Sequence, residues 1–157
     1  MSNVYKSARR PTKLEVFVYA TDLTEALLSA CHNSNVIPKS YRYDLSANML
    51  EKVFKLYEDV YSANSIYPKG IDTIKMRTKF QKDALIQIEL LLQYWGMVNE
   101  IFKSIPNGTN QHIAELMVSE ENLLKGWIKS DNERYKNILA KNKEKLNDNN
   151  NNDKEEN

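Results

Sequence analysis

Residues able to do acid–base or metal chemistry are few in this chain, which has two histidines and one cysteine. His112 and Glu115 lie one helical turn apart, but a di-iron site in a helical bundle takes Glu and His ligands from several helices. Cys31 and His32 are adjacent, so on a helix they do not face each other as a nucleophile and its base would. We therefore expect a surface helix start at His112, a buried thiol at Cys31 and no bound metal.

Motifs for catalysis are also missing. The sequence contains no P-loop, no GxSxG and no HExxH. Neighbouring carboxylates, such as Glu58 with Asp59 and Glu120 with Glu121, are most simply explained as solvated helix faces. We expect no enzymatic activity, no cofactor and no small-molecule substrate.

Basic side chains offer a different chemistry, the binding of phosphate groups. Residues 1–82 hold thirteen Lys or Arg against eight Asp or Glu, residues 83–133 hold three against eight, and residues 134–146 hold five against one. The formal net charge of +1 therefore conceals two basic blocks separated by an acidic one. Basic groups interleaved with aromatic ones are typical of surfaces that bind a nucleic-acid backbone and stack unpaired bases.

Four amphipathic helices must position these side chains. Apolar residues at three-and-four spacing predict helices over about 13–33, from 40–44 to about 63, over 71–105, and from after Thr109 to about 146. Pro106-Asn107-Gly108-Thr109 is the strongest turn signal in the chain. The sequence thus predicts a basic arm (1–11), an antiparallel up-down four-helix bundle of the all-α class (12–146) and a disordered Asn-rich tail (147–157).

This topology would bring three basic segments to one end of the bundle, namely the start of the first helix, the connection between the second and third, and the end of the fourth. Exposed Lys and Arg often do no more than solvate helix ends, and that alternative stays open. The nucleic-acid-binding candidates at this end are Arg9, Arg10, Lys13, Lys69, Lys75, Arg77, Lys79, Lys82, Arg134 and Lys136.

The cysteine count and the absence of long apolar runs predict the cellular compartment. One cysteine excludes an intramolecular disulfide, and no apolar run of about 18 residues or secretory leader is visible. We expect a cytoplasmic protein with no membrane segment.

Two short motifs resemble those of a known family. PKSYRYDL at 38–45 and KGWIK at 125–129 are similar to segments of the Avd family, the accessory variability determinants of diversity-generating retroelements, and ELLLQYWGMVNEI on the third helix is similar in pattern. These proteins are four-helix bundles related to those encoded in intervening sequences of bacterial 23S rRNA genes. The likeness covers about residues 14–130.

The resemblance implies a homopentamer that binds the element's reverse transcriptase and template RNA and supports mutagenic cDNA synthesis without catalysing it. Carried over by position, it adds Lys39, Arg42, Lys125, Gly126, Trp127 and Lys129 as candidates. Ile37 stands where the family has Phe, Lys125 replaces the first Gly of the second motif, and the chain continues past residue 131 where the family typically stops.

Three residues are expected to be structural or to lie at an interface between subunits. Trp95 and Trp127 belong to apolar stripes, and Gly126 in mid-helix costs about 1 kcal/mol relative to Ala, which close approach of another helix would explain. The alternative function is a structural or protein-interaction bundle of the rRNA intervening-sequence type, with no retroelement role.

Overall fold

The computed structural model of the protein describes the backbone of residues 13–155 and the side chains of residues 15–146. This part of the chain is helical and contains no strand, which confirms the all-α prediction. The four α-helices are α1 (Lys13–His32), α2 (Ala47–Ser65), α3 (Ile71–Ile101) and α4 (Asn107–Glu155).

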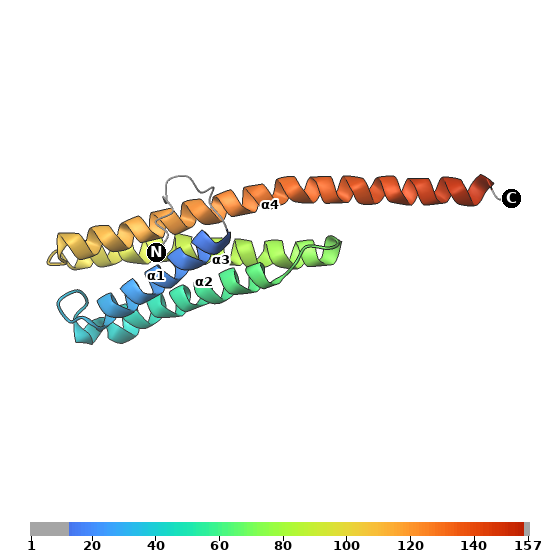
Figure 1. Ribbon diagram of the computed structural model, residues 1–157. Coiled ribbons are helices and arrows are strands. Elements are labelled where there is room, and N and C mark those ends of the chain that lie inside the picture. Colours follow the sequence, from blue (N-terminus) through green and yellow to red (C-terminus); the bar gives the residue numbers. More distant parts are fainter. Residues whose placement is uncertain (1–12, 156–157) are drawn as a thin grey trace, which may run out of the picture.

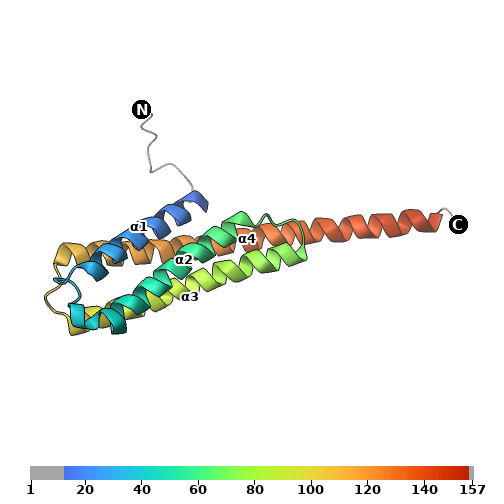
Figure 2. The ribbon, with the colours of Figure 1, turned by 90° about the horizontal axis from the view of Figure 1, so that it is seen from below.

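The helices form an antiparallel up-down bundle, as predicted (Figures 1 and 2). α1 packs on α2 and α4, and α3 packs on the same two helices from the other side. The connections α1–α2 and α3–α4 therefore lie at one end of the bundle, and the α2–α3 connection lies at the other. We call the second end the α2–α3 end.

Local interactions set the helix ends. The Thr73 hydroxyl oxygen accepts hydrogen bonds from the backbone N–H groups of Lys69 (3.0 Å) and Gly70 (3.1 Å), which orders the start of α3. α3 ends at Ile101, four residues earlier than predicted, because Phe102 turns to an extended conformation. α4 begins at Asn107, inside the predicted turn, since Pro106 is compatible with a helix start and its carbonyl accepts from Asn110 at 3.0 Å.

The connection between α1 and α2 is more structured than expected. It contains a 3-10 turn (Lys39–Tyr41) and a π turn (Arg42–Ser46), so that regular α2 begins at Ala47. Val36 and Ile37 are both buried and anchor this connection on the core. The predicted start of helix two at residues 40–44 thus corresponds to these turns.

The core consists of the apolar stripes that the spacing predicts. Leu23 and Leu27 of α1, Leu56 of α2, Leu91 of α3 and Leu124 of α4 are all fully buried. The same stripes also bury polar residues, which the sequence analysis did not expect. The charged and amide side chains among them are Asp59, Arg77, Gln81, Glu120 and Asp131.

The prediction that Asp59 and Glu120 belong to solvated faces is therefore wrong. Asp59 has no exposed surface and is bonded to Lys55 at 2.8 Å. Burial raises the pKa of Asp59, and the hydrogen bond from Lys55 opposes that effect. Both carboxylates fall on the buried helical spacing of their own helix, which outweighs the acidic neighbour beside each of them.

α4 is much longer than the other helices. It continues past the α2–α3 end with no helix beside it and reaches Glu155, whereas the sequence predicted a helix to about 146 and disorder from 147 (Figure 1). No Gly or Pro follows Gly126, so the sequence has no residue that ends the helix sharply. Residues 140–146 are exposed all round.

Candidate functional site

Two of the three predicted basic segments meet at the α2–α3 end. The Arg134 guanidinium lies over the ring of Tyr67, 5.8 Å from its centroid, and so joins α4 to the α2–α3 connection. Tyr67 remains 64% exposed, which leaves the rest of its ring open to solvent. The predicted basic residues that are exposed here are Lys69, Lys75, Lys79, Lys82, Arg134 and Lys136.

The third basic segment cannot be placed at this end. Arg9 and Arg10 lie outside the described residues, and so does the side chain of Lys13, although its backbone opens α1. The candidate surface therefore rests on the α2–α3 connection, the first turns of α3 and the later turns of α4.

Arg77 has to be removed from this surface. Its side chain is 1% exposed, and Nε donates to Oδ2 of Asp131 on α4 at 2.7 Å. Nη1 donates to the carbonyl oxygens of Ala63 (2.8 Å) and Ile66 (3.0 Å), where α2 ends. The guanidinium thus ties α2, α3 and α4 together inside the bundle. Its Nη2 makes no hydrogen bond but is buried, so a phosphate group in solvent cannot reach it.

Asp131 is the centre of this buried network. Its Oδ2 also accepts hydrogen bonds from Gln81 Nε2 at 2.7 Å and from the Tyr135 hydroxyl at 3.2 Å. Burial, together with the Asp131 carboxylate, raises the pKa of Tyr135. Arg77 and Gln81 donate from α3 to this buried carboxylate of α4 and so fix the register of the two helices, while Tyr135 donates from α4 itself.

Trp127 and Trp95 are both structural. Trp127 is 7% exposed, and its ring lies 5.0 Å from the Arg77 guanidinium carbon, a cation–π contact that covers the network. Trp95 is 3% exposed and donates from Nε1 to Asn110 Oδ1 at 2.9 Å, which connects α3 to the start of α4.

Gly126 is exposed, and a methyl group added at its Cα would meet nothing within 4 Å. Among the described residues, no other helix comes within 4 Å of that added methyl group. The close approach of another helix that a mid-helix Gly predicts is therefore not found in the described part of the chain.

Lys39 and Arg42 lie at the opposite end of the bundle, on the α1–α2 connection. Lys39 is exposed, whereas Arg42 is half-buried and donates from Nη2 to the carbonyl oxygen of His32 at 3.4 Å. The structure does not bring these two residues together with the basic surface at the α2–α3 end.

A basic groove runs between α3 and α4. It has a volume of about 410 Å³, and we call it the α3–α4 groove. Leu85 and Ile128 are half-buried residues on its walls, and Lys125 Nζ is already bonded to Glu121 at 2.6 Å, which raises the pKa of that ammonium. The lining residues are Leu85, Lys125, Ile128, Lys129, Asn132, Glu133 and Lys136.

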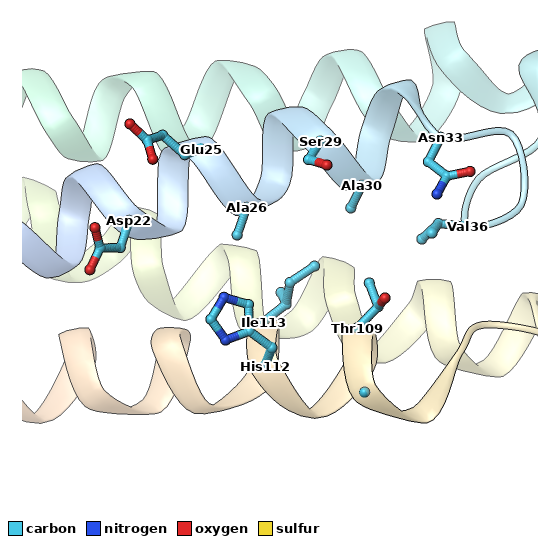
Figure 3. A pocket seen from close by; sticks show the side chains of 11 residues that line it. Asp22, Glu25, Ala26, Ser29, Ala30, Asn33, Val36, Thr109, His112 and Ile113 are labelled. Carbon is cyan, nitrogen blue, oxygen red and sulfur yellow. The ribbon is translucent and has the colours of Figure 1, made fainter.

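A second, larger groove of about 610 Å³ lies between α1 and the first turns of α4, and Figure 3 shows it from close by. Asp22 and His112 point into it from opposite sides, and Glu25 and Ser29 lie further along α1. Its floor is made by small and aliphatic side chains such as Ala26 and Ala30. The carboxylates make this groove, which we call the α1–α4 groove, unfavourable for a phosphate group.

Residues 15–146 contain no group of three His, Cys, Asp or Glu side chains that would hold a metal ion, and the absence of a bound metal stays a prediction. His112 and Glu115 are exposed, as expected of a surface helix start. Cys31 is 1% exposed, which confirms the buried thiol, and burial raises its pKa.

Glu120 differs from Asp131 because no donor reaches its buried carboxyl group. Neither carboxylate oxygen has a hydrogen bond, and burial raises its pKa to about 9. It is therefore a neutral carboxyl group at neutral pH.

Comparisons with family models, with curated proteins and with solved structures give no match. None of the helices in the described part of the chain is both long and apolar enough to cross a membrane.

Proposed function

We propose that this protein is a non-catalytic RNA-binding bundle of the cytoplasm. The observation that carries the proposal is the gathering of exposed Lys and Arg side chains from α3, α4 and the α2–α3 connection at one end. Phosphate contacts add up charge by charge, so a cluster of exposed cations is what such binding requires. The buried Arg77–Asp131 pair holds the elements that carry these cations.

The more specific part of the proposal is an accessory role to a reverse transcriptase. It depends on the resemblance of the 38–45 and 125–129 motifs to the Avd family. In that role the protein binds the polymerase and its template RNA and supports mutagenic cDNA synthesis.

Assembly with copies of itself is part of the same proposal, with five subunits suggested by the resemblance. The outward face of α3 supplies a suitable surface, because Ile86, Leu90, Met97 and Ile101 are 38–50% exposed and follow each other at spacings of four, seven and four residues. Such a spacing places them on one helix face. An exposed apolar stripe is typical of an interaction surface.

The same stripe favours the second candidate function, a protein-interaction bundle that does not bind nucleic acid. In that case Lys75, Lys79 and Lys82, which precede the stripe on α3, would pair with acidic groups of a protein partner. The two functions differ in whether RNA binds at all.

Fluorescence anisotropy of a labelled structured RNA, titrated over a salt series, tests the proposal. We expect micromolar or tighter binding whose log–log salt slope is steeper than about −4, as six or more phosphate contacts to a single strand require. Light scattering on the same sample should give a mass of several subunits. Absence of binding at low salt would leave the protein-interaction bundle.

The matched variants are Lys79→Glu/Lys82→Glu at the basic end and Lys39→Glu/Lys103→Glu at the other. All four lysines are exposed, and both double changes lower the formal charge by the same amount. We expect the first to weaken binding by about tenfold or more and the second to have little effect. Arg77 is left unchanged because its loss would test folding instead of binding.

A further inference from the structure

We propose that the α3–α4 groove is the RNA-binding track of this protein and that it takes a single strand. This inference rests on the proposed RNA-binding function. It specifies where the RNA binds and that the bound RNA is unpaired. Lys129 and Lys136, with Lys125, line one side of this groove along α4.

The spacing of these lysines is the first support. Residues 125, 129 and 136 are four and seven positions apart, so they lie on the same helix face. Eleven residues of helix extend about 16 Å, and along this line three Lys side chains outnumber one carboxylate, that of Glu133. Such a line fits a backbone of repeated negative charges.

The walls of the groove are the second support. Leu85 on α3 and Ile128 on α4 are half-buried and present aliphatic surface beside the lysines of α4. Bases and riboses of an unpaired strand have apolar faces that such walls can contact without sequence preference. In a duplex those faces are already stacked on neighbouring bases.

The usual spacing of packed helices is the third support. Packed helix axes are about 8–10 Å apart, so a groove between two helices admits one extended strand. A duplex would rest across both helices and would reach only the tips of the lysine side chains. We therefore expect a preference for single strands.

The groove lysines differ in whether they pair with a carboxylate, and this difference predicts how much each one contributes to RNA binding. Lys125 is bonded to Glu121 at 2.6 Å, whereas Lys129 and Lys136 make no ion pair in the described part of the chain. Lys125→Ala should thus weaken binding less than Lys129→Ala. Glu121→Gln should strengthen binding a few-fold because it frees the Lys125 ammonium.

The experiment compares two double variants in the full chain, Lys129→Glu/Lys136→Glu in the groove and Lys75→Glu/Lys79→Glu on the outward face of α3. The probes are a labelled single-stranded RNA and the same strand annealed to its complement. We expect the groove variant to lose about tenfold or more in affinity for the single strand, with a salt slope shallower by about 1.4, and the wild type to prefer the single strand.

The inference fails, and the proposed function stands, if the duplex binds as well as the single strand or if the α3 variant loses more than the groove variant. Both fail if the wild type binds neither probe. Circular dichroism and thermal melting check that each variant folds. Lys129→Ala replaces the groove variant, and Lys79→Ala replaces the α3 variant, if the double change prevents folding.

Discussion

The described side chains of α4 fall into two halves, residues 107–124 and residues 125–146, that differ in charge. Residues 107–124 contain three Glu and no Lys or Arg, whereas residues 125–146 contain seven Lys or Arg and three Asp or Glu. The first half borders the α1–α4 groove, with its carboxylates, and the second borders the basic α3–α4 groove. One continuous helix thus carries an acidic and a basic region to opposite ends of the bundle.

Each half also buries one carboxyl group, and the two carboxyl groups differ in the hydrogen bonds that they receive. Asp131 receives three hydrogen bonds, one of them from Arg77, while Glu120, eleven residues earlier on the same face, receives none. Burial is almost the same, since Asp131 is 3% exposed and Glu120 is 0% exposed. The difference shows that donors, rather than depth, decide whether a buried carboxylate holds the fold together or opposes it.

Loss of the Arg77–Asp131 pair should lower the stability of the protein more than any other change proposed here. Arg77→Met leaves the Asp131 carboxylate buried without its cation, so the free energy of unfolding should fall by about 3–5 kcal/mol, measured by urea denaturation. Arg77→Met/Asp131→Leu, which removes both charges, should regain much of that loss. If Arg77→Met is as stable as the wild type, the network does not hold the basic half in place.

Glu120 should make stability depend on pH. Its pKa is raised from 4.5 to about 9 in the folded protein. The proton is therefore bound more tightly in the folded state, and the stability that it contributes is complete below about pH 4.5 and is lost as the pH rises towards 9. Each pH unit in this window should cost up to about 1.4 kcal/mol, or roughly 3 kcal/mol in total by pH 7.

The measurement is the difference in unfolding free energy between the wild type and Glu120→Gln, taken from pH 5 to pH 9. Gln has no proton to lose, so this variant should lack the wild-type slope. Subtracting the two curves removes the contribution of the other titrating groups. Parallel curves would mean that Glu120 is ionised and solvated in the folded protein.

Substitution of Gly126 should change the free energy of unfolding least. Gly126 lies at the boundary of the two halves, and a methyl group has free space there. Gly126→Ala should raise the unfolding free energy by about 1 kcal/mol through helix propensity alone, with no change in RNA affinity. A smaller mass by light scattering would instead show that a second copy approaches the helix at this position.

Most of the helical framework could be predicted from the sequence. The stripe from Ile74 to Val98 follows the three-and-four spacing closely enough that α3 begins at the expected residue, Ile71. The helix ends were less predictable. They depend on local geometry, such as the extended Phe102 and the helix start after Pro106, and residue types alone do not specify it.

The site was predictable only in part. The convergence of basic segments followed from the up-down topology, but Arg77 was counted among the exposed cations because composition does not show burial. A signal was present, since Arg77 and Gln81 continue the buried spacing between Ile74 and Ala84. The partner, Asp131, is 54 residues away in sequence, so the pair itself could be recognised only from the fold.

The most direct test of the basic half of α4 as an RNA-binding surface is a lysine-labelling footprint of the wild-type protein. Lysines are modified with and without saturating single-stranded RNA, and mass spectrometry measures the change at each position. We expect protection of Lys129 and Lys136 and unchanged labelling of Lys39 and Lys103 at the other end. Equal protection at both ends, or protection at Lys39 and Lys103 alone, would contradict the account.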